Sequence, residues 1–482
     1  MHKIILAASF TIFLASCKDS PSMIDYSEIS DPIKRVRAAY QVDRLLAANT
    51  IRLEEDLREN ESNFEYSSDF QEMTSRRRHH IVDLKNGSAS SESLREISRT
   101  YHHGRQIIKD GRSWTIIYPT SSYQERGEAD VLSLYGPFAR ASGALLAVWL
   151  DKAADSARLE GKEMWFGEQH DKVTFDFPNS SPLTILVQEN TGYISKLSRQ
   201  VGDIRVSYTF NYHELQNGIP IAREHSGYVN SERRYFSFNR NIILDDADDN
   251  NAFELESGLY LEPERVDQSA MTAEAVTDTI FQVGQNRTYT SFIKTQSGLV
   301  AFGVGAGFAD RLKAYRDASN DTSPLAYAIA PSLHRARIMG AGEAAATGAT
   351  LLVTPDAEAR IASALDEAAK IKSISAPVTI DTLTIYNLET SNAAENLVVY
   401  NSADRTLIQS SHYSIPFVEA PILNELNAEG LRQRISELGL TPTHIVDTES
   451  KRIESWDVFE TVVDSFDFKK CYWERKICEG WG

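Results

Sequence analysis

The residues of this chain that could carry out hydrolytic chemistry stand in three separate segments of its second half. His334 offers an imidazole that could ligate a metal ion or act as a general base, and Ser332 stands two positions before it. His412, preceded by Ser411, and Asp447 follow later in the sequence. A serine beside a histidine could form a nucleophile–base pair, whereas histidine and carboxylate side chains together could hold a metal ion. Both hypotheses require the fold to bring these segments together.

The segment 328–355 has the layout needed to present His334 in a turn. Small and apolar residues lead to Ala330, a polar and basic turn follows, and residues 342–347 form a predicted short helix of small residues. The β-branched and leucine run at 350–353 then predicts a further strand. Strands and helices alternate from residue 275 to 464, which favours two sheets covered by helices on their outer faces, an αββα sandwich.

This strand–turn–helix–strand unit resembles the metal-binding unit of the metallo-β-lactamase superfamily, in which the turn carries the motif HxHxDH. The resemblance covers residues 275–464 and implies a hydrolase fold with one or two zinc ions. At the positions where the family has its metal ligands and the neighbouring turn, this chain has Gly303, Ser332, His334, Ala336, Arg337, Ala393, Ser411 (or Ser410) and Thr448. Only His334 among these could hold a metal ion.

The residue types at these positions predict a cleft without zinc and without any other cofactor. The guanidinium of Arg337 would repel a dication at short range. We therefore expect a non-enzymatic binding or scaffold protein, with a small molecule, a lipid or an envelope protein as its partner. The alternative is a hydrolase with a rearranged active site, for which His334, His412 and Asp447 are the candidate catalytic residues.

The N-terminus has the pattern of a bacterial lipoprotein signal. A short positive segment, an apolar run over 4–14 and the sequence Leu-Ala-Ser-Cys ending at Cys17 resemble the lipobox, which implies diacylation of Cys17. The apolar run is too short to span a bilayer comfortably. The alternative is an ordinary signal peptide with a chance cysteine. Lys18 after the cysteine implies the outer membrane, so we expect a lipid-anchored protein of the cell envelope that faces the periplasm.

Charge and cysteine content narrow the class of partner. The chain has 50 basic and 68 acidic residues, a net charge of −18, which argues against binding to nucleic acid. With Cys17 acylated, Cys471 and Cys478 remain, and in an oxidising compartment a disulfide between them is favoured. No pair of histidines stands near them in the sequence, so we do not predict a zinc site there.

The first half has the period-two pattern of a β-rich domain. One or two amphipathic helices are predicted up to about residue 60, and short strands are predicted between residues 95 and 239, around a helix at 137–150. The basic run 76–80 is expected in a solvated loop or at a strand edge. Part of this region resembles the β-rich domain found ahead of secreted hydrolases of the same superfamily, which implies a half-barrel-like antiparallel sheet.

A half-barrel of this kind also allows a lipid or lipoprotein carrier. That hypothesis predicts an apolar cavity lined by Leu145, Val148, Trp149 and Phe175, whereas the favoured alternative is that these residues form the core. The predicted organisation is α+β. It comprises a signal peptide (1–17), a tether with helices (18–60), the half-barrel (61–245), an acidic linker (246–274), the αββα domain (275–464) and a C-terminal tail (465–482).

Overall fold

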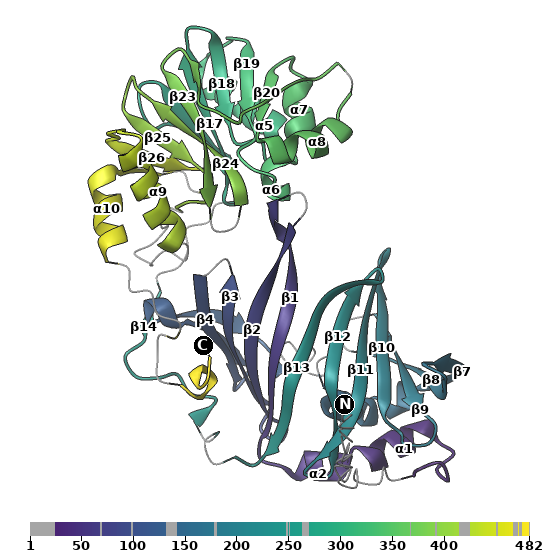
Figure 1. Ribbon diagram of the computed structural model, residues 1–482. Coiled ribbons are helices and arrows are strands. Elements are labelled where there is room, and N and C mark those ends of the chain that lie inside the picture. Colours follow the sequence, from purple (N-terminus) through teal and green to yellow (C-terminus); the bar gives the residue numbers. More distant parts are fainter. Residues whose placement is uncertain are drawn as a thin grey trace, which may run out of the picture.

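The computed structural model describes residues 25–67, 70–97, 100–131, 142–177, 181–246, 249, 251–262, 269–366, 368–390, 393–413, 425–449, 452–465, 471 and 475–481. The strands form sheets of fourteen, seven and six members, and helices pack against each of them (Figure 1). The predicted α+β class is therefore confirmed. Cys17 and the proposed signal peptide lie outside the described residues.

The first domain is built on one long sheet that is antiparallel except at its edge, where β14 pairs parallel with β6. Its order is β14-β6-β5-β4-β3-β2-β1-β13-β12-β11-β10-β9-β8-β7. The strands are β1 (Ile51–Ser67), β2 (Phe70–Asp83), β3 (Ser88–Ile97), β4 (Thr100–Lys109), β5 (Arg112–Ile117), β6 (Ser122–Glu128), β7 (Arg158–Trp165), β8 (Glu168–Phe175), β9 (Leu183–Gln188), β10 (Ile194–Val201), β11 (Ile204–Gln216), β12 (Ile219–Val229), β13 (Glu232–Leu244) and β14 (Tyr260–Leu261).

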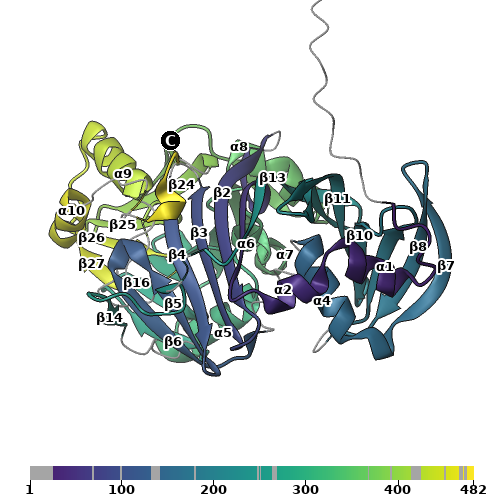
Figure 2. The same ribbon diagram turned by 90° about the horizontal axis from the view of Figure 1, so that it is seen from below.

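The sheet packs around three helices, α1 (Pro32–Ala39), α2 (Val42–Ala47) and α4 (Gly143–Lys152). Asp31 caps α1 by accepting hydrogen bonds from the amides of Ile33 and Lys34, and Pro32 stands where no amide donor is needed. The apolar residues of α4 are buried on every side of the helix, because strands from both halves of the sheet pack against it. Figure 2 shows α2 and α4 between these two halves, with β2–β6 on one side and β7–β11 on the other.

The second domain contains the other two sheets. The seven-stranded sheet comprises β15 (Thr272–Ala275), β16 (Ile280–Gln285), β17 (Thr288–Thr295), β18 (Gly298–Phe302), β19 (Leu325–Ile329), β20 (Thr350–Val353) and β21 (Lys370–Ser373). The six-stranded sheet comprises β22 (Val378–Ile380), β23 (Leu383–Thr390), β24 (Ala393–Asn401), β25 (Thr406–Gln409), β26 (His444–Asp447) and β27 (Ile453–Ser455).

These two sheets pack face to face, and helices cover their outer faces. Phe302 and Ile329 from one sheet share a buried cluster with Leu397 and Val446 from the other. The helices that belong to the seven-stranded sheet are α5 (Phe308–Ser319), α6 (Arg335–Ile338), α7 (Ala341–Ala345) and α8 (Pro355–Ser363), and those on the six-stranded sheet are α9 (Glu425–Glu437) and α10 (Trp456–Asp464). Four layers result, and the loops at one end connect residues from both sheets.

The start of the first domain differs from the prediction in two respects. The helices end at Ala47, and residues 51–60, which were predicted as helical, belong to β1. The basic run 76–80 lies inside β2, between β1 and β3, rather than in a loop or at an edge. Its arginines pair with carboxylates of the neighbouring strand β1. Arg77 Nε lies 2.8 Å from Asp56 Oδ1, and Arg78 Nη2 lies 2.7 Å from Glu59 Oε1. Cross-strand carboxylates therefore allow basic residues in a central strand.

The segment predicted as an acidic linker packs on the first domain. Its Asp249 is buried and accepts a hydrogen bond from Arg52, with Nη1 2.9 Å from Oδ1. Leu255 and Leu259 pack against a buried cluster that contains Ile107. The linker prediction was therefore wrong for the described part of 246–262, which packs on the sheet. Asp246 and Asp249 pair there with Arg52, and Glu256 pairs with Arg105.

The two domains meet at the long hairpin of the first sheet. β1 contacts β24, and Figure 1 shows the upper end of β1 beside α6. Near the start of the described chain, the amide of Tyr26 donates a hydrogen bond of 2.7 Å to the carbonyl of Asn190, in the turn between β9 and β10. Within the described ranges, no helix is both long and apolar enough to cross a membrane.

Candidate functional site

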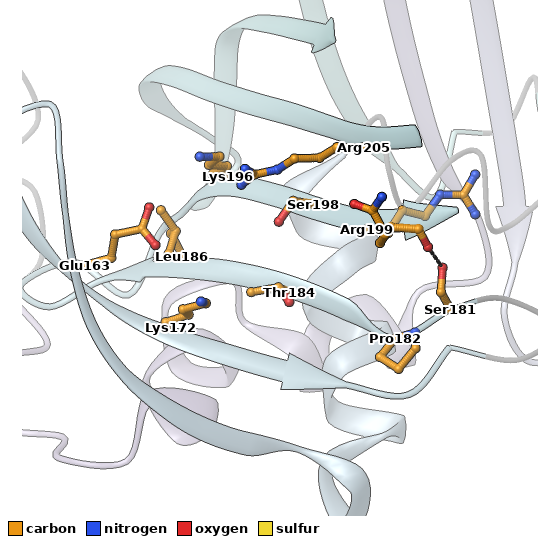
Figure 3. Close-up of a pocket in the computed structure, with 11 residues that line it drawn as sticks. Glu163, Lys172, Ser181, Pro182, Thr184, Leu186, Lys196, Ser198, Arg199 and Arg205 are labelled. Atoms are coloured by element: carbon orange, nitrogen blue, oxygen red, sulfur yellow. Dashed lines mark hydrogen bonds between the residues drawn. The ribbon is translucent and has the colours of Figure 1, made fainter. Parts of the chain in front are cut away.

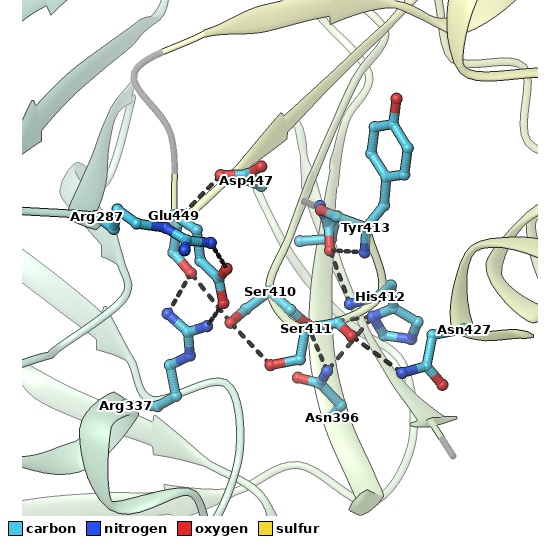
Figure 4. Close-up of polar contacts among 12 residues, drawn as sticks. Arg287, Arg337, Asn396, Ser410, Ser411, His412, Tyr413, Asn427, Asp447 and Glu449 are labelled. Carbon is cyan, nitrogen blue, oxygen red and sulfur yellow. Dashed lines mark hydrogen bonds and ion pairs between the residues drawn. The ribbon is translucent and has the colours of Figure 1, made fainter. Parts of the chain in front are cut away.

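The candidate site lies where loops from both sheets of the second domain meet, and several of the predicted positions contact one another there (Figure 4). Thr448 follows β26, and Ser410 follows β25 directly. The hydroxyl oxygens of these two residues lie 3.0 Å apart. Ser410 Oγ lies 3.5 Å from Ser411 Oγ. Arg337, on α6, donates to Thr448 Oγ1 at 2.9 Å. Gly303 follows β18, and a Cβ built on it would lie 3.1 Å from Thr448 Cγ2.

Arg337 belongs to an ion-pair network at this end of the sandwich, in which Glu449 is the shared partner. Its guanidinium pairs with Glu449, and Glu449 also pairs with Arg287, whose Nη2 lies 3.1 Å from Oε2. The Arg337 side chain is 14% exposed and that of Arg287 is 55% exposed, so the inner pair is better shielded from water. The backbone amide of Glu449 also donates 2.6 Å to Asp447 Oδ1, which fixes the loop that presents the carboxylate.

The residues at the positions aligned with the metal ligands of that family do not fit a catalytic zinc ion. Zinc needs several imidazole, thiolate or carboxylate groups at about 2.0–2.3 Å. The groups that converge here are two serine hydroxyls, a threonine hydroxyl, a guanidinium and the single carboxylate of Glu449, which is paired with two arginines. The backbone conformation also disfavours a metal-ligating side chain at position 303. Gly303 has φ +93°, which disfavours a side chain, and a Cβ there would lie 3.0 Å from the carbonyl oxygen of Tyr289. The guanidinium of Arg337 places a permanent positive charge at this site.

The turn before α6 does not form a nucleophile–base pair. Ser332 is fully buried, and its hydroxyl has no hydrogen-bond partner within the described part of the chain. His334 is the residue before α6 and is 5% exposed. Ala336 is exposed on α6, and Ala393 is buried at the start of β24.

His412 and Asp447 are both buried, but they face different surroundings. The Nδ1 atom of His412 lies 3.3 Å from the carbonyl oxygen of Ser410 and 3.4 Å from Asn396 Nδ2, on the far side of Ser410 from Arg337 (Figure 4). Burial lowers the pKa of His412 to about 4. Within the described residues, His334, His412 and Asp447 do not form a group of ligand atoms within 4.8 Å of one another. These three residues therefore do not have the geometry of a metal site.

A basic groove lies on the first domain, on the face of β7–β11 that is opposite to the helices (Figure 3). The groove has a volume of about 300 Å³, and its charged lining residues are Lys172, Lys196, Arg199, Arg205 and Glu163. Lys196 Nζ lies 3.9 Å from the ring centre of Trp165, a cation–π contact. Desolvation lowers the pKa of Lys196. The carboxylate of Glu163 acts against this shift, whereas the charges of Arg205 and Lys172 add to it. An anion in the groove would relieve that repulsion.

The apolar residues proposed to line a lipid cavity are core residues. Leu145 and Val148 of α4 are at most 1% exposed, and they share one buried cluster with Phe175 of β8 and with Trp149. Trp149 also packs on Phe177, with ring centres 4.8 Å apart. The burial of these four side chains agrees with the alternative prediction, in which they form the core of the domain.

Sequence reasoning missed one cluster of chemically active groups. The predicted disulfide between Cys471 and Cys478 is present, with Cα atoms 6.0 Å apart, and the tail that carries it packs on the first domain. There His103 of β4 lies beside it, with Nδ1 3.6 Å from Cys471 Sγ. His103 is 368 positions from Cys471, so sequence spacing gave no signal of this contact.

The sequence matches no protein-family model and no curated protein at a significant level. Solved structures do match. The structure of TMB-1 is 13% identical, over 40% of this chain and 96% of that protein, with a TM-score of 0.34. A metallo-β-lactamase from Pontibacter korlensis is 12% identical, over 41% of this chain and all of that protein (TM-score 0.33), and the mono-zinc form of FIM-1 from Pseudomonas aeruginosa is 13% identical, over 42% and 96% (TM-score 0.32).

Proposed function

We propose that this chain is a lipid-anchored protein of the bacterial cell envelope in which a metallo-β-lactamase-like domain serves for binding or as a scaffold, without hydrolysis. The observation that carries the proposal is the Arg337–Glu449–Arg287 network at the former ligand positions. A metal ion placed there would meet the fixed positive charge of Arg337, and the one carboxylate of the network, Glu449, is already paired with two arginines. The αββα layering of the second domain is the part of the enzyme architecture that remains.

Two experiments test this proposal. The chain from Lys18 onward is assayed with β-lactam, carboxylic ester and phosphodiester substrates, with and without added zinc, and no turnover above the uncatalysed rate is expected. Turnover that His334→Ala abolishes would favour the hydrolase with a rearranged site. The anchor is tested by acyl labelling and membrane fractionation of the full chain. Cys17→Ser should remove the label and release the protein, whereas label retained by this variant would contradict lipidation.

The basic groove supports a second candidate function, the binding of an anionic lipid headgroup. Four cations gather there on a chain whose net charge is −18, and Trp165 holds one of them in place. Tyr26, nine positions after Cys17, is bound at the turn between β9 and β10, two of the strands that form the groove. A tether of that length spans at most about 30 Å, so an anchored membrane would lie within reach of the groove.

Vesicle flotation of the unacylated Cys17→Ser chain tests the groove. We expect association with vesicles that contain anionic lipid, weaker association with neutral vesicles, and loss of the difference at high salt. Lys196→Glu should abolish the preference. Lys313→Glu, the same charge change on α5 in the second domain, should leave the preference intact. Equal binding by both variants would refute a role for the groove.

A further inference from the structure

The C-terminal tail is held on the outer face of the first sheet by charged and apolar contacts. Ile477 is fully buried, and Arg475 reaches Glu92 of β3, with Nη2 2.8 Å from Oε2. Arg77 donates to the carbonyl of Ile477 at 3.2 Å. These contacts place Cys471 and Cys478 beside β4, in a position set by the sheet as well as by their own bond.

The geometry around the two sulfur atoms is that of a ligand set. In the described residues, His103, Cys471 and Cys478 are the group of three metal-binding side chains whose ligand atoms all lie within 4.8 Å of one another. The distance from His103 Nδ1 to Cys471 Sγ is 3.6 Å. Bonds of about 2.3 Å to sulfur and 2.0–2.1 Å to nitrogen, at a tetrahedral angle, would separate the two ligand atoms by about 3.6 Å.

The second nitrogen of His103 is already oriented for this role. Nε2 lies 2.8 Å from Glu92 Oε1, and the imidazole is buried. Arg475 also binds this carboxylate, with Nη2 2.8 Å from Glu92 Oε2. A carboxylate that accepts the Nε2 proton leaves the Nδ1 lone pair directed at the sulfur atoms, the arrangement that outer-shell carboxylates give to zinc-bound histidines.

We propose that His103, Cys471 and Cys478 form a redox-gated site for a thiophilic divalent cation such as Zn²⁺, with a fourth position open to water. In the oxidised chain the disulfide occupies the sulfur atoms and the site binds no metal. A dithiol reductant transfers two electrons and two protons to the disulfide, which gives two thiols and oxidises the reductant to its own disulfide. Binding of the cation then releases both thiol protons, and the metal links the two tail cysteines to His103 of β4.

Titration of the mature chain with Co²⁺ tests this proposal. The chain is treated anaerobically with a phosphine reductant, which is then removed. We expect one equivalent of Co²⁺ per reduced chain, with thiolate charge-transfer and tetrahedral d–d absorption that Zn²⁺ abolishes, and no such spectrum from the oxidised chain. A reduced chain that gives no such spectrum would overturn the proposal.

Variants distinguish this site from two adventitious thiols. His103→Gln keeps a donor toward Glu92, and we expect its affinity to fall by more than the roughly 10- to 100-fold typical of a lost outer-shell partner. Glu92→Gln should fall within that range, and Cys478→Ser, at a half-buried position, should lose the charge-transfer bands. His444→Gln, on β26 of the second domain, is the matched control and should bind as wild type does. Undiminished binding by His103→Gln would refute the site.

Discussion

The inner ion pair of the candidate site, between Arg337 and Glu449, should contribute measurably to the stability of the second domain. Glu449 bridges a shielded arginine, Arg337, and an exposed one, Arg287. Breaking a fully buried pair costs about 3–5 kcal/mol, whereas an exposed pair contributes about 0–1 kcal/mol. Because Arg337 and Glu449 are 14% and 25% exposed, we expect a coupling free energy of about 1.5–3 kcal/mol for the inner pair and less than about 1 kcal/mol for the outer pair.

Two double-mutant cycles measure these couplings, Arg337→Met with Glu449→Gln and Arg287→Met with Glu449→Gln. The free energy of opening is read from native-state hydrogen exchange of the amides of β26, which reports the second domain separately from the first. The outer cycle is the internal control, because it shares the carboxylate and the substitution types. If the inner coupling is no larger than the outer one, the guanidinium of Arg337 does not serve as a buried cation and the reasoning fails.

Three further outcomes are expected. His412→Gln should flatten the pH dependence of stability in the second domain, measured by urea unfolding between pH 7 and 4. Burial lowers the pKa of His412 from 6.5 to about 4, so the unfolded chain takes up the proton first and up to about 3 kcal/mol is lost as the pH falls through this window. Arg35→Met strands Asp171, its buried partner at 2.8 Å, and should cost the first domain about 3–5 kcal/mol of unfolding free energy by calorimetry. Arg475→Met should release the tail from Glu92, seen as faster hydrogen exchange at 475–481.

The pattern of apolar residues predicted most of the second domain. The predicted strand at 350–353 is β20, and the small-residue helix at 342–347 is α7, shifted by one or two residues. Predictions failed where tertiary contacts outweigh composition. The spacing of apolar residues over 357–370 favours one helix, but α8 ends at Ser363, because β21 begins at Lys370 and pairs with β20.

Charge was a poor guide to burial in the first domain. The basic run of β2 was predicted in a solvated loop or at a strand edge and the acidic segment after β13 as a linker, but side chains of both pair with opposite charges on the first sheet. Arg52 and Asp249 are 197 positions apart, and both are buried. A single sequence contains no information on such partners, so the same limit concealed the contact between His103 and Cys471.

The site itself was predictable as a set of positions and not as a network. The alignment with the metal motif located Arg337 and Thr448, which the fold brings to 2.9 Å of each other. The carboxylate that completes the network, Glu449, and its second partner, Arg287, have no counterpart in that motif. Their roles follow from the loop after β26 and from the turn between β16 and β17.

Metal content of the oxidised chain tests the central claim most directly. The protein from Lys18 onward is purified without chelator or reductant, beside a variant in which Cys471 and Cys478 are both replaced by serine, and zinc, iron and manganese are measured per chain. We predict less than about a tenth of an equivalent in both proteins, unchanged after incubation with zinc. About one or two equivalents in the serine variant would mean that the second domain holds a metal centre after all. That result would contradict the assignment of Arg337 as the cation of the site.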